Sequence, residues 1–330
     1  AWAAHNIAKG EWKVNGYFPF NVYHPNRVIN APFYQDRIVE QWFVEKYIQP
    51  VFRPKLHKYN MACQSGKGPF LAMDYVKAAM EEMYYMYGDQ WYVFQYDIEG
   101  YFDNISHKAA KKIMKQIGEE GYAIYEKIVD SFCIRDGHPE NPDGYGYPKG
   151  TLPSQWTGII LLDALNWQIQ DTPGCVFNIS YMDDGLAFFQ SIEQCRKCRE
   201  DTEQFLIKNE LGIRLHPRKT YYAPISRGFT FCGWRYTIDH DSTIHVRIKN
   251  SKKKEMENRL KAISESVKTG KMSLAKANTI RDGMFKYLSH GTASDSSKLI
   301  RYMKHQYPFQ SVKQKGKNKG GKHYESKTER

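Results

Sequence analysis

Polar and apolar positions alternate in strand fashion near the start of the chain, over residues 17–31. A Pro-Asn pair at positions 25 and 26 interrupts the alternation, which predicts an antiparallel hairpin. The period then becomes helical over 33–52, and we expect Pro50 to end this helix. Its apolar stripe comprises Ile38, Phe43, Val44 and Ile48.

The rest of the chain mixes helical and strand patterns before it becomes purely helical. Helices are predicted over 69–87, 106–117 with Ser106 as the N-cap, 154–170 and 191–210. Strands are predicted over 91–98, 175–181, 185–190, 213–224 and 229–238. Basic amphipathic helices begin at Ser251 and Ser273, and the first has an apolar stripe of Met256, Leu260, Ile263 and Val267. This order indicates an α+β fold followed by an all-helical end.

The length of 330 residues suggests two or three packed units, because a domain usually takes roughly 100 to 200 residues. No run of about 18 apolar residues and no basic-then-apolar leader occurs. We therefore expect a soluble, cytoplasmic protein with no membrane partner. The chain begins at Ala1 without an initiator methionine, which suggests that it starts inside a longer gene product.

Positive charge is concentrated in the last quarter of the chain. Residues 1–244 hold 26 Lys and Arg against 29 Asp and Glu (26 − 29 = −3), whereas residues 245–330 hold 22 against 7 (22 − 7 = +15). Such an excess favours a phosphate backbone as the partner over a merely solvated basic face. The tail 311–330 is rich in Lys and Gly, so we expect it to be flexible until it meets RNA or DNA; a targeting signal is the rival interpretation.

The six cysteines are scattered, as is usual for proteins of a reducing compartment. Cys195 and Cys198 form a CxxC pair on a predicted helix, but no second pair lies near them in the sequence. Because zinc sites need four ligands, we interpret these two residues as ordinary buried thiols.

Three aspartates stand where strands are predicted to end. Asp97 closes one apolar strand, and Asp183 and Asp184 occupy a tight turn between two others. Phosphoryl-transfer chemistry with two divalent ions needs carboxylates that come together from separate strands. A double Asp at a solvated hairpin tip is the simpler interpretation of such a turn, and Glu99 and Asp103 are expected to face solvent.

The order of the surrounding motifs resembles that of reverse transcriptases. FQYDIEGYFDNI (94–105) resembles motif A and YMDD (181–184) resembles motif C, with Asp183 standing 86 positions after Asp97 (183 − 97). Between them, KGTLPSQW (149–156) resembles motif B. The segments that resemble motifs D and E, the fingers motifs and the region before the palm are HPRKTYYAPISRGFTFCGW (216–234), HPNRVINAPFYQDRIV (24–39) and YNMACQSGKG (59–68). The resemblance spans roughly residues 17–305.

This resemblance implies a right-hand polymerase with fingers and palm, built on an antiparallel palm sheet with helices, and a helical thumb. The fingers would occupy 1–90 and be incomplete at the N-terminus, the palm 91–240 with inserted fingers elements, the thumb 241–310 and the basic tail 311–330. The implied activity is RNA-directed DNA synthesis from dNTPs with two Mg²⁺ ions, for which Mn²⁺ is an alternative.

The resemblance also implies a role for individual residues. Asp97 and Asp183 would be the principal metal ligands, with Asp184 supporting them and Ile98 adjoining the metal site. Arg27 would contact the incoming triphosphate, as suits a fixed guanidinium fork. Lys219 is a candidate acid for the departing pyrophosphate, and a solvated lysine at a strand end is the simpler alternative. The remaining implied residues are Gly150, Ser154 and Gln155 at the nucleotide, Cys232, Gly233 and Trp234 in the primer grip, and Lys252, Lys253 and Lys254 at the RNA or DNA backbone.

Phe102 stands where reverse transcriptases carry an aromatic residue that blocks a ribose 2′-hydroxyl. RNA-dependent RNA polymerases usually place Asp at this position. An aromatic ring leaves the hydroxyl neither room nor a partner, whereas a carboxylate accepts its hydrogen bond. DNA synthesis is therefore favoured, and a purely structural role in the core is the alternative for Phe102.

Two segments depart from the commonest family pattern, motif B and the loop that carries Gln64. Lys149 stands where most relatives carry Gln, and the pair Ser154-Gln155 resembles the motif of diversity-generating retroelements. Gln64 stands where many relatives carry Arg, which puts one nucleotide or template contact in doubt. We expect unusual template or fidelity behaviour.

Three functions follow from the resemblance. The first is a reverse transcriptase of a diversity-generating bacterial or phage retroelement, which copies a dedicated structured RNA together with a small helical accessory protein. The second is an antiphage-defence enzyme of the abortive-infection type that works with its own noncoding RNA. The third is a non-polymerising, maturase-like RNA-binding scaffold.

Overall fold

The computed structural model describes residues 5–7, 9–23, 26–135, 144–239, 241–289 and 295–309. The chain divides into two compact units, Ala1–Lys249 with Gly291–Asp295 and Asn250–His290 with Ser296–Arg330. The predicted flexible tail 311–330 and the residue Pro25 of the predicted hairpin turn lie outside the described residues.

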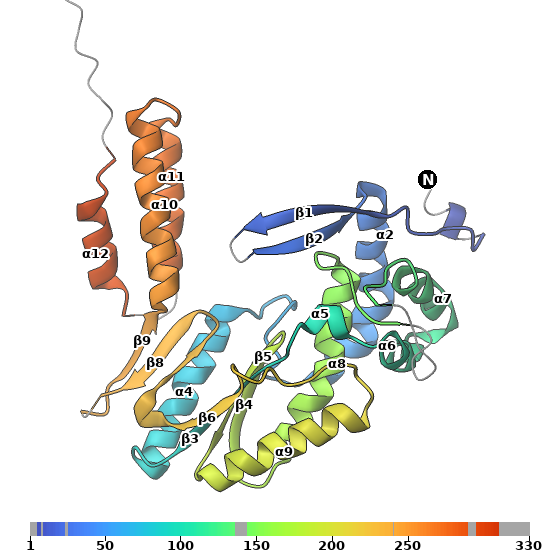
Figure 1. The fold of residues 1–330 in the computed structure, drawn as a ribbon, viewed down its shortest axis with the longest axis horizontal. Helices are drawn as coiled ribbons and strands as arrows, with labels where there is room; N and C mark the ends of the chain where they lie inside the picture. The colour runs from blue at the N-terminus through green and yellow to red at the C-terminus, as the bar shows by residue number, and fades with distance from the viewer. Residues whose placement is uncertain are drawn as a thin grey trace, which may run out of the picture. The chain divides into compact units, whose positions relative to one another are not determined.

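The first unit begins with the predicted hairpin. β1 (Tyr17–Tyr23) and β2 (Asn26–Pro32) pair antiparallel along their whole length (Figure 1). In this register Phe20 lies opposite Ile29, and Val22 lies opposite Arg27. Residues that are paired across two strands share a face of the sheet, so Arg27 lies on the same face as Phe20 and Ile29.

The helix after the hairpin differs from the prediction at Pro50. α2 (Tyr34–Phe43) continues through a π-helical turn, η1 (Val44–Ile48), into α3 (Gln49–Phe52) and a 3₁₀ turn, η2 (Arg53–Lys55). A proline ring clashes with the carbonyl four residues earlier and removes a helical donor. Because the wider π turn immediately precedes Pro50, the chain stays helical through it.

The buried face of α2 is also different from the expected one. Ile38 is 54% exposed, whereas Asp36 and Glu40 are buried beside Val39 and Phe43. The Asp36 carboxylate accepts hydrogen bonds from the main-chain and side-chain nitrogens of Asn15 at 2.9 and 2.8 Å. These partners lie 21 positions away in the sequence, so the helical period of α2 alone gives no sign of them.

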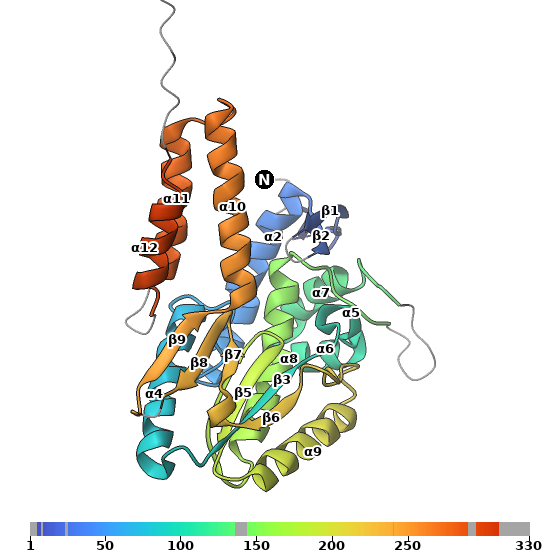
Figure 2. The same ribbon diagram turned by 60° about the vertical axis from the view of Figure 1, so that its left-hand side comes forward.

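A four-stranded antiparallel sheet forms the centre of the unit (Figure 2). Its strands, in spatial order, are β4 (Cys175–Tyr181), β5 (Asp184–Phe189), β3 (Tyr92–Asp97) and β6 (Tyr221–Pro224). The helices that contact its strands are α4 (Pro69–Tyr87), α8 (Leu152–Gln170) and α9 (Ile192–Lys208). On α9, Cys195 and Cys198 are buried free thiols, as predicted.

The predicted strands after α9 are partly wrong. Residues 213–220 form no strand beyond an isolated bridge from Leu215 to Ile98, and only Tyr221–Pro224 joins the sheet as β6. After a 3₁₀ turn, η4 (Ile225–Arg227), the predicted strand 229–238 is a tight hairpin of β7 (Phe229–Phe231) and β8 (Trp234–Ile238). β9 (Ile244–Ile248), inside the segment that was expected to be helical, completes this second sheet.

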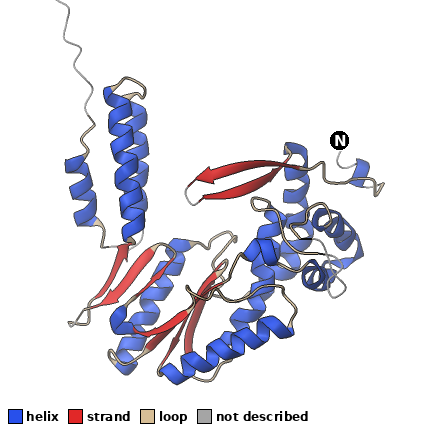
Figure 3. Ribbon diagram, viewed as in Figure 1, coloured by secondary structure: helices blue, strands red, loops and turns tan. Residues whose placement is uncertain are grey.

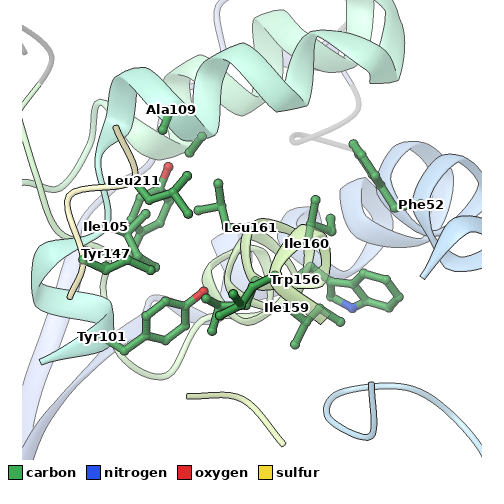
Figure 4. Packing of buried hydrophobic residues seen from close by; sticks show 14 of the residues in the cluster. Phe52, Tyr101, Ile105, Ala109, Tyr147, Trp156, Ile159, Ile160, Leu161 and Leu211 are labelled. Atoms are coloured by element: carbon green, nitrogen blue, oxygen red, sulfur yellow. The ribbon is translucent and has the colours of Figure 1, made fainter. Parts of the chain in front are cut away.

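Short helices pack around α8 to form the core (Figure 4). They are α5 (Tyr101–Asn104), α6 (His107–Met114), the 3₁₀ turn η3 (Lys115–Ile117) and α7 (Gly118–Val129). The Ser106 side chain caps α6 by accepting from the Ala109 amide at 3.2 Å, as predicted. α7 was not predicted; Gly118, with φ of +82°, lets the chain turn into it.

The second unit is helical (Figure 3). It contains α10 (Asn250–Lys268), α11 (Leu274–Leu288) and α12 (Ser297–Gln306). The predicted stripe of α10 is buried, and Ser273 caps α11 by accepting from the Lys276 amide at 3.3 Å. Ile263 and Val267 pack against Ala277 of α11, which joins these two helices.

Candidate active site

The predicted aspartates lie at adjoining ends of two central strands. Asp97, the last residue of β3, lies opposite Asp184, the first residue of β5. Asp183 belongs to the turn before β5, and its carbonyl accepts from the Ile98 amide at 3.0 Å. Met182 adopts a left-handed conformation with φ of +55°, which allows the turn to close within two residues. Antiparallel pairing thus brings together carboxylates that are 86 positions apart (183 − 97).

Lys219 forms an ion pair with Asp97. Its ammonium lies 3.0 and 3.1 Å from the two carboxylate oxygens. The lysine side chain is 61% exposed and the aspartate 18% exposed, so the pair opens to solvent on the lysine side. The Asp97 carboxylate is therefore already paired with a cation.

Burial and mutual repulsion raise the pKa of the other two aspartates. For Asp183 the main cause is burial, and the charge of Asp97 adds to it, whereas Lys219 and Arg27 oppose the shift. For Asp184, burial raises the pKa to about 7, and the neighbouring Asp183 and Asp97 contribute. The influence of Arg27 places β2 within electrostatic reach of the turn at Asp183.

Asp184 is held by a hydrogen-bond donor that the sequence analysis missed. Gln95, two positions before Asp97 on β3, donates to the Asp184 carboxylate at 3.3 Å and to the Thr230 carbonyl at 2.7 Å. The Tyr221 hydroxyl donates to the Gln95 side-chain oxygen at 2.7 Å. The only sign of this role in the sequence is that Gln95 is an amide inside an otherwise apolar strand. A buried amide needs hydrogen-bond partners.

The aspartate carboxylates fit a magnesium ion whose coordination shell is completed by substrate. Among the described residues, no three His, Cys, Asp or Glu side chains are arranged to hold a metal. The three aspartates do not form a complete ligand set. Asp97 is paired with Lys219, and Asp184 accepts a hydrogen bond from Gln95. Mg²⁺ characteristically takes one or two carboxylates and fills its remaining positions with water and substrate phosphates. Two carboxylates such as Asp97 and Asp183 would meet this requirement once Lys219 leaves Asp97.

The sequence comparison decides the family. A family model described as reverse transcriptase (RNA-dependent DNA polymerase) matches residues 25–236, which contain all the elements of this site. The chain belongs to the reverse transcriptase family.

Two solved structures are similar to this reverse transcriptase. Telomerase from Candida albicans, in complex with a fragment of telomeric RNA, matches 93% of the chain at 10% identity with a TM-score of 0.53. Apo telomerase from Candida tropicalis matches 74% at 13% identity with a TM-score of 0.48. The chain covers only 57% and 59% of those two proteins. The family match and the likeness to the Candida albicans telomerase together show the predicted right-hand polymerase fold of mixed helices and antiparallel sheets.

Two further comparisons give negative results. No curated protein matches the sequence. Across the described part of the chain, no helix combines the length and apolar character needed to cross a membrane.

Phe102 of the reverse transcriptase lies on α5, a helix that is fixed on both sides. The preceding Tyr101 points toward α8 (Figure 4) and donates to the Gly158 carbonyl at 2.5 Å. The Phe102 carbonyl accepts from the Tyr147 amide at 2.7 Å. Phe102 itself is half-buried and packs against the core cluster. Its backbone is therefore held in place while part of its ring stays accessible.

The predicted nucleotide-binding residues of motif B have three different environments. Gly150 has φ of +114°, and a Cβ there would lie 2.6 Å from Ile29 of the hairpin. Ser154 is buried, and its hydroxyl and amide are both hydrogen-bonded to the Thr151 hydroxyl, which caps α8. The Ser154 hydroxyl is therefore engaged at the start of this helix. Gln155 is half-buried, and its side-chain oxygen lies 3.6 Å from the Cys63 sulfur.

Cys63 connects motif B with the YMDD turn. Its sulfur also lies 3.6 Å from the Met182 sulfur. The next residue, Gln64, is buried and donates to the Asn60 carbonyl at 2.8 Å. Gln64, which by the resemblance stands where many relatives carry Arg, therefore supports its own loop.

A buried network behind this loop was also missed. Asp163 of α8 accepts from the His57 amide at 2.9 Å, from Asn60 at 2.9 Å and from the Trp167 indole at 3.1 Å. Lys67 donates to the carbonyls of residues 57, 58 and 60. The loop that carries Cys63 is thus tied to α8.

The predicted primer-grip residues lie at the turn between β7 and β8, with Cys232 and Gly233 in the turn and Trp234 as the first residue of β8. Cys232 and Gly233 both have positive φ, +50° and +85°, as a two-residue hairpin turn requires. Burial raises the pKa of the Cys232 thiol, and the charge of Asp184 adds to the shift, so this turn lies near the carboxylates. Trp234 is fully buried and anchors the hairpin.

The predicted backbone-binding lysines lie in the second unit, on α10. Lys252 pairs with Glu255 at 3.0 Å, and Lys253 pairs with Glu257 at 4.0 Å. Lys254 is exposed.

Proposed function

We propose that this chain is the polymerising part of an RNA-directed DNA polymerase that extends a primer with dNTPs on an RNA template. The observation that carries the proposal is the convergence of Asp97, at the end of β3, with Asp183, in the turn before β5, within electrostatic reach of Arg27 and Lys219. Two carboxylates with two cations beside them suit a triphosphate bound together with divalent ions.

Each residue then has a part in nucleotidyl transfer. Two divalent ions, Mg²⁺ or Mn²⁺, would activate the primer 3′-hydroxyl and stabilise the leaving pyrophosphate. Asp97 and Asp183 would hold these ions, while Gln95 keeps Asp184 in place beside them. Arg27 would bind the triphosphate, and Lys219, displaced from Asp97, is the candidate to protonate the departing pyrophosphate.

We propose that DNA rather than RNA is made because Phe102 occupies the space of a ribose 2′-hydroxyl. The fixed backbone of α5 supports this role, since a ring that is held in place excludes an added oxygen more strictly than a mobile ring does. A hydroxyl pressed against the ring would also lose its hydrogen bonds to water.

We further propose that the template is a dedicated structured RNA of a diversity-generating bacterial or phage retroelement. The support is the Ser154-Gln155 ending of motif B. The alternative is an antiphage-defence enzyme with its own noncoding RNA, and the likeness to telomerase, being one of fold, favours neither. Sequencing the nucleic acid that copurifies with the protein, and locating it in the genome, distinguishes them. An RNA that carries a near-identical repeat of a nearby variable-protein gene supports the first, and a noncoding RNA from a defence cluster supports the second.

The activity is tested by primer extension on an RNA template with Mg²⁺ and either dNTPs or rNTPs. We expect extension with dNTPs that is abolished in the double variant Asp183→Ala, Asp184→Ala. Extension that survives this double change overturns the mechanism, and a wild-type chain that binds the RNA primer–template without extending it supports a maturase-like scaffold. Phe102→Ala is expected to increase rNTP use, and unchanged rNTP use removes the gate assignment.

A further inference from the structure

Lys149 makes two contacts that join separate parts of the first unit. Its ammonium lies 2.7 Å from the carboxylate of Asp103 on α5. Its carbonyl accepts from the Asn30 amide of β2 at 2.8 Å. Asp103 directly follows Phe102, and Asn30 lies three positions after Arg27 on β2. One residue therefore connects the helix that carries the sugar gate with the strand that carries the triphosphate-binding arginine.

The neighbouring contacts make this connection stiff. Tyr147 binds the Phe102 carbonyl, so the segment 147–149 runs along α5. Gly150, at φ of +114°, lies so close to β2 that any side chain there would collide with Ile29. Between these two close approaches, the Lys149 backbone has little freedom to shift.

The side-chain half of the connection depends on charge. Lys149 and Asp103 are 32% and 38% exposed, so water screens their attraction and the pair adds little to overall stability. A pair of this kind affects where α5 lies more than whether the chain folds. Its loss leaves Tyr101 and the Phe102 carbonyl in place, but it frees the end of α5 next to the gate.

We propose that the Lys149–Asp103 ion pair is a positioning device that holds the sugar gate at a fixed distance from the triphosphate site. This proposal rests on the proposed function. A dNTP must present its sugar to Phe102 and its phosphates to Arg27 at the same time. The spacing of these two contacts then determines how strictly a 2′-hydroxyl is excluded and how tightly the nucleotide binds. Asp103 and Lys149 act through Phe102 and do not contact the reacting atoms.

The test is a double-mutant cycle in single-nucleotide primer extension. The variants are Lys149→Gln, Asp103→Asn, the combination of both, and the charge reversal Lys149→Asp with Asp103→Lys. For each variant, kcat and KM are measured with dNTP and with rNTP, and the urea midpoint is measured alongside. Lys197→Gln is the matched control, because it removes a partly exposed ion pair with Asp201 on α9, which carries no predicted site residue.

We expect each single variant to lose up to about fivefold in discrimination between dNTP and rNTP, mainly through KM, with little change in the urea midpoint. The two losses should not add in the double variant, because both remove the same pair. The charge reversal should recover part of the discrimination, and Lys197→Gln should change nothing.

Two outcomes overturn the proposal. One is discrimination that equals the wild-type value in both single variants, and the other is losses that simply add in the double variant. These outcomes are distinct from failure of the proposed function, in which the wild-type chain itself would not extend the primer. If the single variants lower the urea midpoint and kcat together while leaving discrimination unchanged, the pair is structural and the proposal is also refuted.

Discussion

The buried carboxyl of Glu40 should make the stability of the first unit depend on pH. Glu40 is 2% exposed on α2, and one of its oxygens has no hydrogen-bond partner. Burial, together with the charge of Asp36 one turn earlier, raises its pKa from 4.5 to about 8. The folded chain therefore keeps a proton that the unfolded chain releases between these two values.

The sign and size of the effect follow from this difference in pKa. Below pH 4.5 both states are protonated, and the stability that comes from burying a neutral carboxyl is fully present. As the pH rises toward 8, the free energy of unfolding falls by up to about 1.4 kcal/mol per pH unit. Between pH 5 and pH 8 the loss is at most about 4 kcal/mol, and Glu40→Gln removes it because an amide does not titrate in this range.

Urea unfolding at several pH values, followed by the fluorescence of the four fully buried tryptophans of the first unit, measures this effect. We expect Glu40→Gln to gain stability over the wild type steadily from pH 5 to pH 8. The cost of burying the introduced amide is the same at every pH. The relevant quantity is therefore how the stability difference between the variant and the wild type changes with pH. Glu119→Gln, on the exposed surface of α7, is the control. A stability difference that stays constant across this range refutes the reasoning.

Two further predictions concern packing around the site. A Cβ at Gly185 would lie 2.2 Å from the ring of the buried Tyr96, so Gly185→Ala should lower the free energy of unfolding by at least about 1–3 kcal/mol and reduce primer extension. Gly283→Ala, where no atom lies within 4 Å, should instead leave the second unit as stable or stabilise it by up to about 1 kcal/mol, and equal urea midpoints for the two variants would contradict this contrast. Asp163→Ala removes the acceptor of the His57 amide, of Asn60 and of the Trp167 indole, although Asn60 keeps its bond to the Ile159 carbonyl, and it should cost roughly 1–3 kcal/mol in the same assay. An unchanged urea midpoint would contradict this prediction.

The sequence predicted the central strands because each is a short apolar run with a polar end. β3, β4 and β5 lie within about one residue of their expected bounds, and the turn at Asp183 joins β4 to β5 as expected. The helices α4, α8 and α9 have strong periodic or capping signals and were likewise predicted.

The errors arose where long-range contacts outweigh local pattern. The turn at Cys232 splits the predicted strand 229–238, because a non-glycine residue there adopts φ of +50°. The burial of Glu40 and the contact of Lys219 with Asp97 both depend on residues from different elements. The latter spans 122 positions, a distance over which periodicity carries no information.

Strand order also determines which part of the site is most protected. β3 lies between β5 and β6, so amides along both of its edges are bonded to neighbouring strands, whereas the hairpin of β1 and β2 is a sheet of only two strands. Amide hydrogen exchange should therefore be slowest along β3 and much faster in the hairpin. Opening of the strand pairs at Arg27, away from the bond between Asn30 and Lys149, can then occur many times while Asp97 stays in place. Under the proposed function, a nucleotide can thus leave Arg27 while the strand that carries Asp97 stays folded.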